Sequence, residues 1–501
     1  MGKKRVLVPA EEVDLSLVKY EPEVIQAQLL TGWMLKLFVK MLEIPFIGPF
    51  MLSKTHKQMH QLLRNTVIPE APMYRPQFPP QEKEESVVTV EEDGKPEERV
   101  EVALNGLPQY DPASRWNSTD LATPFRYWKI RDYAHAYRSK LVTPSLVAEH
   151  VISVIKEFGN PISILDGIFM AIKDDIDCYP HSTKDGTAWL HDVHPLEKDA
   201  AAAVSRLRSC GVIFVGKANL HELGSGVTGS NATYGTPRNL HAEDRYTGGS
   251  SSGPAAIVAH GICSAALGTD GGGSIRITSS LCVVVGLNTT HGHTDMEGVL
   301  SEHVAVAVVG PIASSVEDVM LVYAAIVGSS PADRISLNQS PPCLPNLASY
   351  ESADALGSIR LGKYTEWFND VFQLMSLINV KISLTCYPKH MGVKKHCFFS
   401  YFMVVLLQRV DFLWFGYIWL KSVVIAIPEL QELKVAHLVS MAEAACSLVP
   451  HFEGAGKQAS YPTRLSVAFV QGFTASDYVA SACLSMTAPI IPASALKVWG
   501  E

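Results

Sequence analysis

The chain has 501 residues, of which 47% are hydrophobic and 18% are charged. This length and composition can bury a large core, so we expect a globular protein with two or three average domains or one large α/β domain. With 42 basic and 50 acidic residues, the formal charge is −8. A chain with this balance lacks the positive surface that binds nucleic acid, and we expect no nucleic-acid partner.

The nine cysteines are scattered without a Cys-x-x-Cys spacing. Their odd number, without a signal peptide, indicates reduced thiols in a cytosol-facing protein. His56 and His60 have helical spacing, but without a carboxylate or third ligand such a pair is more typical of a solvated helix face than of a metal site. We expect no metal and no cofactor.

Residues 31–43 predict a short helix that is large and apolar except for one stripe. The stripe consists of Lys36, Lys40 and Glu43, and Pro45 and Pro49 should end the helix before a further apolar turn at 50–52. The helix is too short to span a bilayer. Its composition suits a membrane interface, or burial against the main domain or a second copy of the chain, and both interpretations stay open.

A proline-rich connection, 69–80, follows these helices. Apolar alternation at 87–90 and 100–104 around Asp93-Gly94 predicts a small solvated hairpin.

From residue 143 the pattern becomes α/β. It predicts a helix at 143–159, a buried strand at 162–172, a helix at 199–209 and a strand at 212–215. Ser314 and Glu317 have the spacing of a capping box that opens a helix through 326. Strands and helices that alternate in this way indicate a mostly parallel sheet with helices on both faces.

Two clusters of glycines and hydroxyl-bearing residues form the most informative stretch. They read Gly-Gly-Ser-Ser-Ser-Gly (248–253) and Gly-Thr-Asp-Gly-Gly-Gly-Ser-Ile-Arg (268–276), and a helix and a short strand could lie between them. Glycine-rich backbone exposes consecutive N–H groups that can bind an oxyanion, so Ser274 is placed like a nucleophile. The first cluster alone would be typical of a linker. No Lys-Ser/Thr pair follows the glycines, which disfavours a phosphate-binding loop.

With Ile-Lys-Asp at 172–174, these clusters resemble the amidase signature family. The stretches 165–177 and 245–253 and the opening 49 residues are most similar to the branch of plant fatty acid amide hydrolases. The similarity extends over roughly 1–365 and fragments of 427–497. It implies an α/β fold with a mixed, mostly parallel twisted sheet flanked by helices, an N-terminal helical extension and a homodimer.

The resemblance also implies a catalytic triad. In it, Ser274 is the nucleophile, Ser250 is a relay serine after a cis peptide bond, and Lys173 is the base. A lysine acts as a base only when neutral, which the apolar flank 168–172 would favour, whereas Asp174 and Asp175 would oppose it if close.

The remaining predicted site residues support the triad. The oxyanion hole is expected from the backbone amides of Gly271, Gly272, Gly273 and Ser274. Ser251 and Ser252 are expected to be supporting hydrogen-bonding groups. Asp270 and Arg276 are expected to form an ion pair or to fix the loop.

The resemblance fails in the segment 369–426, which is dense in aromatic residues and leucine. Arg409 and Asp411 near its centre disfavour a spanning helix, and translated intron sequence explains it better. We therefore expect N-terminal amphipathic helices at 1–65, a lead-in at 66–142, an amidase core at 143–368, an atypical apolar insertion at 369–426 and a partial C-terminal part of the core at 427–501.

The resulting expectation is a serine hydrolase on a cytosol-facing membrane surface, at the endoplasmic reticulum or plasma membrane. Its substrates would be lipid amides, with N-acylethanolamines hydrolysed to fatty acid and ethanolamine. Two alternatives remain: a hydrolase of another small amide, and a catalytically impaired membrane-associated isoform.

Overall fold

The computed structural model describes residues 5–6, 30–67, 87–89, 94–112, 125, 128–150, 168–190, 201–300, 305–328, 342–347, 360–363, 421–424, 435–437, 442–443 and 458–487. The predicted insertion therefore lies outside the described residues except at 421–424, and so does the second half of the helix predicted at 143–159.

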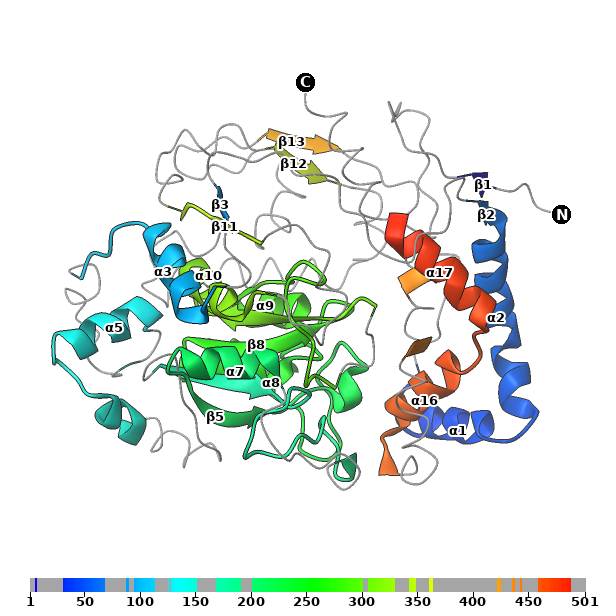
Figure 1. Ribbon diagram of the computed structural model, residues 1–501. Helices are drawn as coiled ribbons and strands as arrows, with labels where there is room; N and C mark the ends of the chain where they lie inside the picture. The colour runs from blue at the N-terminus through cyan, green and yellow to red at the C-terminus, as the bar shows by residue number, and fades with distance from the viewer. Residues whose placement is uncertain are drawn as a thin grey trace.

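A five-stranded sheet lies at the centre of the molecule (Figure 1). Its strands, in spatial order, are β5 (Ile213–Ala218), β4 (Phe169–Lys173), β8 (Ala265–Asp270), β10 (Val308–Ala313) and β9 (Val285–Gly286). β4 pairs in parallel with β5 and β8, and β10 is antiparallel to β8 and β9. β5, β4, β8 and β9 thus run in one direction, and β10 runs in the opposite direction. The predicted mixed, mostly parallel sheet is confirmed, and every residue of β4, β8 and β10 is buried.

Helices cover both faces of this sheet. The chain leaves β4 through α7 (Ala202–Ser209) to β5, then returns through α8 (Ser252–Ala259) to β8 on the other side of β4. Right-handed crossovers in opposite directions place α7 and α8 on opposite faces. α10 (Val316–Ile326) packs against α7, α3 (Pro96–Asn105) and β10, and the whole forms one large apolar core.

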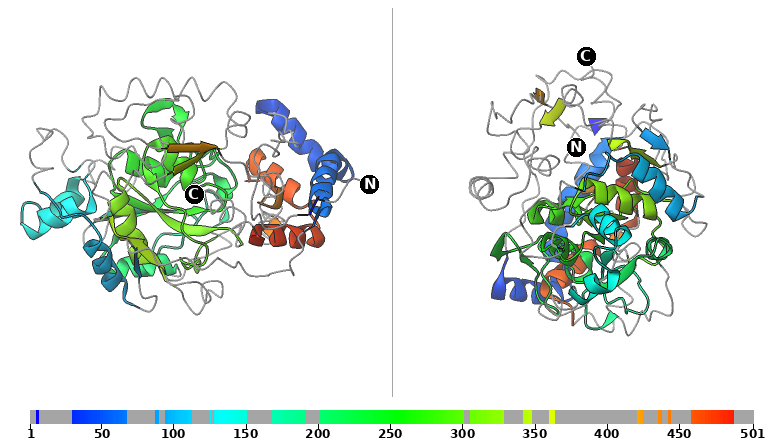
Figure 2. Two further views of the ribbon diagram at one scale, coloured as in Figure 1. Left: turned by 90° about the horizontal axis from the view of Figure 1, so that it is seen from above. Right: turned by 90° about the vertical axis from the view of Figure 1, so that its left-hand side faces the viewer.

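A separate helical layer lies beside the sheet. It combines α1 (Gly32–Leu42) and α2 (Ile47–Asn65) with α16 (Tyr461–Val470) and α17 (Ala475–Thr487). α1 contacts α16 and α2 contacts α17, so segments about 400 residues apart lie side by side (Figures 1 and 2). Its small core is formed by Met59, Leu63, Val435, Ala436 and Leu484.

The N-terminal helix prediction is confirmed by α1, but two details are wrong. Pro49 lies inside the first turn of α2, where a missing N–H is tolerated, and that helix continues to Asn65. His56 and His60 do not face solvent. His56 is 9% exposed and its ring packs against two phenylalanines near α16, while His60 Nε2 lies 3.0 Å from a carboxylate oxygen of Asp477 on α17. The C-terminal helices α16 and α17 therefore cover the face of α2 that the sequence predicts to be solvated.

The predicted hairpin at 87–104 is wrong. β3 (Val87–Thr89) pairs instead with β11 (Cys343–Pro345), and 96–105 forms α3. Val100, Ala103, Leu104 and Leu107 have helical spacing and pack in the main core. Part of this apolar spacing also fits strand alternation, which is why the sequence predicts a hairpin here.

The predicted capping box is displaced by one residue. Ser315 caps α10, its Oγ accepting from the Asp318 amide at 3.2 Å, while Ser314 Oγ donates to the Asp318 carboxylate at 3.0 Å. Glu317 pairs with Lys129 and Arg131 instead of reaching back to the cap. The helix itself is confirmed.

Several other predictions agree with the structure. α7, β5 and the end of the strand at 162–172 occur as expected, and residues 144–150 are helical with Thr143 Oγ1 accepting from the Leu146 amide at 3.1 Å.

The remaining elements are β1 (Arg5–Val6), β2 (Thr66–Val67), α5 (Ile130–Arg138), η2 (Glu222–Gly224), β6 (Arg238–Asn239), β7 (Ala242–Tyr246), α9 (Arg276–Cys282), β12 (Arg360–Lys363) and β13 (Lys421–Val424).

Across the described ranges, no helix combines the length and apolar character needed to cross a bilayer. The same ranges contain no group of three or more His, Cys, Asp or Glu side chains arranged to hold a metal ion.

Candidate active site

The predicted site residues meet at the carboxyl edge of the parallel strands. Lys173 is the last residue of β4, Asp270 is the last residue of β8, and the loop that holds His221 follows β5. Open α/β sheets bind ligands at this edge, because the loops there diverge between neighbouring strands.

Lys173 is buried and surrounded by oxygen atoms. Its side chain is 1% exposed, and Nζ lies 2.9 Å from Ser250 Oγ and 2.9 Å from Asp175 Oδ2. Nζ also hydrogen-bonds to Thr269 Oγ1, and that hydroxyl donates to Asp175 Oδ2 at 2.6 Å. The structure thus brings Lys173 and Ser250 into direct contact.

Backbone hydrogen bonds hold Ser250 in place after a cis peptide bond from Gly249. Its carbonyl accepts from the amide of His221 at 3.0 Å and from that of Ser252 at 2.8 Å. A Cβ on Gly249 would lie 2.5 Å from the Gly226 carbonyl oxygen, so only glycine fits at that position.

The two glycine and serine clusters lie against each other. The amide of Ser251 donates to the carbonyl of Ser274 at 3.3 Å, which places the Ser274 backbone beside the residue that follows Ser250. Ser251 Oγ donates to the Thr269 carbonyl at 3.1 Å and Ser252 Oγ to the Asn219 carbonyl at 3.4 Å. These two serines therefore join α8 to the ends of β8 and β5.

Asp270 organises the loop before Ser274. Its carboxylate accepts from the amides of Gly273 (2.7 Å), Ile275 (3.0 Å) and Arg276 (3.2 Å), and the Arg276 guanidinium contributes two more hydrogen bonds at 2.9 and 3.1 Å. Burial tends to raise the pKa of Asp270, but the Arg276 hydrogen bonds and charge and the loop amides outweigh it and lower that pKa. A charged Asp270 therefore holds the loop.

The amides predicted for the oxyanion hole differ in their partners. That of Gly273 is engaged by Asp270, and Gly273 adopts a φ of 116° that favours glycine. Within the described part of the chain, the amides of Gly271, Gly272 and Ser274 form no hydrogen bond. Their role in an oxyanion hole stays a prediction.

Sequence reasoning missed several groups around the triad. Thr269 lies inside the second glycine cluster, one residue before Asp270, but the sequence pattern predicts no role for it. Asp185 is 2% exposed, and burial, together with the charge of Asp175, raises its pKa well above the ordinary value. His437 lies against Gly272 although 165 residues separate them, and no local pattern marks it.

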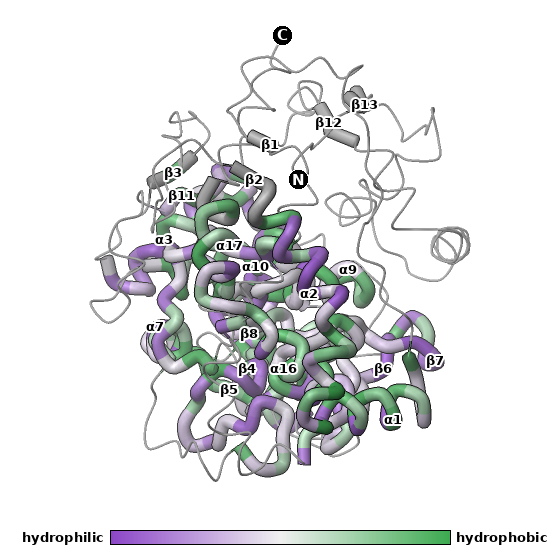
Figure 3. The backbone as a smooth tube through the Cα atoms, turned by 90° about the vertical axis from the view of Figure 1, so that its right-hand side faces the viewer, coloured by the Kyte–Doolittle hydropathy of each residue, from purple (hydrophilic) through white to green (hydrophobic). Residues whose placement is uncertain are grey.

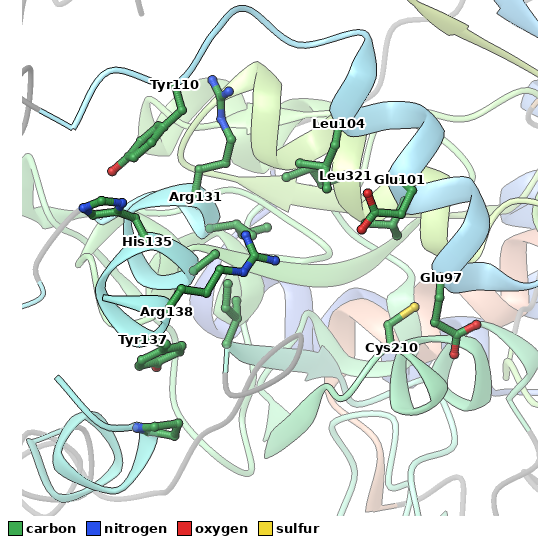
Figure 4. A pocket seen from close by; sticks show the side chains of 15 residues that line it. Glu97, Glu101, Leu104, Tyr110, Arg131, His135, Tyr137, Arg138, Cys210 and Leu321 are labelled. Carbon is green, nitrogen blue, oxygen red and sulfur yellow. The ribbon is translucent and has the colours of Figure 1, made fainter. Parts of the chain in front are cut away.

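A cavity of about 600 Å³ lies elsewhere, between α3, α5 and the end of α7 (Figure 4). Arg131, His135 and Arg138 line it from α5, and Glu97 and Glu101 from α3. Ile168, just before β4, also lines it, whereas Lys173 ends that strand. This cavity is therefore at the opposite end of β4 from the predicted triad.

The fold and site define an α/β hydrolytic enzyme with a buried lysine and two serine-bearing loops. Residues 142–375 match the family model described as "Amidase". The chain is 51% identical to a fatty acid amide hydrolase of Medicago truncatula (99% of this chain, 86% of that one) and 49% identical to a fatty acid amide hydrolase of Arabidopsis thaliana (99% and 87%). The chain belongs to the amidase signature family, and it is an amide-hydrolysing enzyme.

A solved structure supports the fold. The native peptide amidase of Stenotrophomonas maltophilia superposes with a TM-score of 0.52 over 70% of this chain and 78% of that one, at 18% sequence identity. At this identity the likeness supports the shared architecture alone.

Proposed function

We propose that this enzyme hydrolyses fatty acid amides, with N-acylethanolamines as substrates, through a Ser-cisSer-Lys triad of Ser274, Ser250 and Lys173. The observation that carries the proposal is the 2.9 Å contact between Lys173 Nζ and Ser250 Oγ at a buried site beside the Ser274 loop. The similarity to the fatty acid amide hydrolases of Medicago truncatula and Arabidopsis thaliana supports the substrate class.

The relay requires a neutral amine at Lys173, and the number of oxygen neighbours matches the hydrogen-bonding groups of such an amine. Such an amine has two N–H donors and one lone pair. The donors can go to Thr269 Oγ1 and Asp175 Oδ2, leaving the lone pair for the Ser250 hydroxyl. Ser250 can then give its proton to Lys173 as it takes one from Ser274, so the base need not touch the nucleophile.

The reaction then follows two steps. Ser274 Oγ attacks the amide carbonyl, and the oxyanion accepts hydrogen bonds from the amides of Gly271, Gly272 and Ser274. The proton returns from Lys173 through Ser250 to the leaving nitrogen, which departs as ethanolamine. Water attacks the acyl-enzyme ester by the same relay, releasing the fatty acid and restoring Ser274.

The outer surface of α1 and α2 supports a lipid substrate delivered from a membrane surface. Trp33, Phe46 and Phe50 are 74%, 88% and 79% exposed. The polar stripe is exposed as well, with Lys36 Nζ 5.9 Å from the Tyr461 ring centroid and Glu43 paired with Arg464. The α1 tube is mostly green in Figure 3. An apolar surface of this kind suits the interfacial region of a bilayer.

A fluorophosphonate probe tests the nucleophile. Wild-type protein should be labelled on Ser274, and Ser274→Ala should abolish labelling and lower amide hydrolysis by about four to six orders of magnitude. Ser280→Ala, on α9 four residues after Arg276, is the matched control and should behave like wild type. Long-chain N-acylethanolamines should be cleaved faster than short aryl-acetamides. Turnover by Ser274→Ala within tenfold of wild type would overturn the assignment.

A further inference from the structure

We propose that His437 is a positioning residue of the catalytic loop, holding the oxyanion-hole backbone at Gly272 in place from the helical layer. This inference rests on the proposed function, because it assigns a role at the same Ser274 loop.

The contact between His437 and Gly272 is close and specific. A Cβ built on Gly272 would lie 3.0 Å from His437 Nε2 and 3.8 Å from Cε1, and both atoms within 4 Å of it belong to this ring. Gly272 has no positive φ, so its backbone conformation would permit alanine. Within the described residues, the imidazole is therefore the group that lies next to the position a Gly272 side chain would take.

His437 is anchored far from the loop in sequence. The two residues before it, Val435 and Ala436, are buried in the small core of α2 and α17. Ser481 on α17 also donates a hydrogen bond to the Ala436 carbonyl. The helical turn 435–437 thus connects the N-terminal and C-terminal helices directly to the Ser274 loop.

The electrostatic surroundings support a neutral ring. Burial lowers the pKa of His437, and the charge of Arg276 lowers it further, outweighing the opposite effect of Asp270. A neutral ring can pack on the loop without adding a second positive charge beside Arg276. An oxyanion hole works only when its donors are already in place, so a group that restrains Gly272 acts on the chemical step more than on substrate binding.

The first test separates kcat from KM. His437→Ala should lower kcat and the rate of fluorophosphonate labelling about 10- to 100-fold, with KM within about threefold of wild type. His437→Gln, whose amide reaches as far as Nε2, should recover most of the rate. Leu63→Ala, in the same small core but on α2 and outside the turn 435–437, is the control. This control should lower the melting temperature and leave kcat within about twofold of wild type. If His437 had only a structural role, His437→Ala would behave in the same way.

A double-mutant cycle tests the contact itself. Gly272→Ala should lower kcat about tenfold in the wild-type background and less than about twofold in the His437→Ala background, since the ring that the new Cβ meets is gone. Equal effects in both backgrounds, or wild-type kinetics for His437→Ala, would overturn the role of His437. Absence of Ser274 labelling in the wild-type protein would instead count against the proposed function, and this role would fall with it.

Discussion

At the scale of single residues, the central feature is a lysine with almost no solvent exposure. The Lys173 amine has three oxygen neighbours, on Ser250, Thr269 and Asp175. In the proposed relay, its lone pair accepts a proton from Ser250. Its neighbouring strand carries a second lysine, Lys217, whose Nζ lies 3.1 Å from Asp174 and 2.9 Å from Thr183 Oγ1. The two lysines lie on neighbouring strands, but only Lys173 contacts Ser250 and is predicted to act as a base.

We expect Lys173→Ala to lower amide hydrolysis by about 10²–10⁴-fold at neutral pH, because the relay loses its base. Activity should recover in part at alkaline pH, where hydroxide can replace the amine. Lys217→Ala is the control and should keep the wild-type pH–rate profile. Circular dichroism should show both variants folded. A Lys173→Ala profile identical to wild type would remove this residue from the mechanism.

The buried His221 should make an acid-sensitive contribution to the free energy of unfolding. Burial lowers its pKa to about 4, and the charge of Glu222 opposes this lowering only in part. Because the folded-state pKa is below the ordinary value of 6.5, the contribution is fully present above pH 6.5 and is lost as the pH falls towards 4. The shift corresponds to about 3 kcal/mol.

Urea unfolding at several pH values measures this contribution. Wild type should lose about 3 kcal/mol more free energy of unfolding between pH 7 and pH 4 than His221→Gln does. Titrations of Asp270 and other carboxyls are common to both proteins and cancel in the comparison. Parallel stability curves for the two proteins would show that His221 does not contribute.

At the scale of elements, α1 buries Val39 and Leu42 against the protein and leaves other large apolar side chains, among them Trp33, at the surface. Replacing Trp33 and Phe50 with serine should weaken cosedimentation with phospholipid vesicles by about tenfold or more, because each ring can bury about 1.5–3 kcal/mol of apolar surface. Hydrolysis of a short soluble amide should not change.

A control for this experiment is Leu141→Ser, which removes an exposed apolar side chain (57%) on another part of the surface. It should bind vesicles like wild type. If the Trp33 and Phe50 double variant also binds like wild type, α1 is not the membrane-contacting surface.

At the scale of the whole molecule, one buried carboxylate joins the sheet domain to the helical layer. Glu222, 1% exposed, accepts from the Ser460 amide at 2.9 Å and from Thr463 Oγ1 at 2.7 Å, at the start of α16. The same loop supplies the His221 amide that holds Ser250. Docking of the helical layer and placement of Ser250 therefore depend on adjacent residues, Glu222 and His221.

Glu222→Ala should destabilise the fold by about 2–4 kcal/mol, since it removes the acceptor of the partly buried Ser460 amide and one of the two hydrogen-bond partners of the buried Thr463 hydroxyl. Glu43→Ala removes the exposed pair with Arg464 between α1 and α16 and should cost about 1 kcal/mol or less. Thermal and urea unfolding of the two variants measure the difference. Equal losses would mean that the interface is held by apolar packing alone.

Sequence by itself determined the elements whose patterns are local. The spacing of apolar residues predicts α7 and α10, the short buried runs predict β4 and β5, and the two glycine and serine clusters mark the candidate site. Each of these signals depends on residues a few positions apart, which the covalent chain already places together. Where two local periods compete, as at 96–105, the pattern predicts a hairpin and the structure has α3.

Only the tertiary structure decided what meets across long separations. Asp477 covers His60, His437 reaches Gly272, Glu222 binds the start of α16, and Thr269 links Lys173 to Asp175. Nothing in a short window of sequence records such contacts, because they depend on which faces of distant helices and strands pack together. The helical layer and the groups around the triad therefore follow from packing of the whole chain, while the strands and motifs that carry them follow from local spacing.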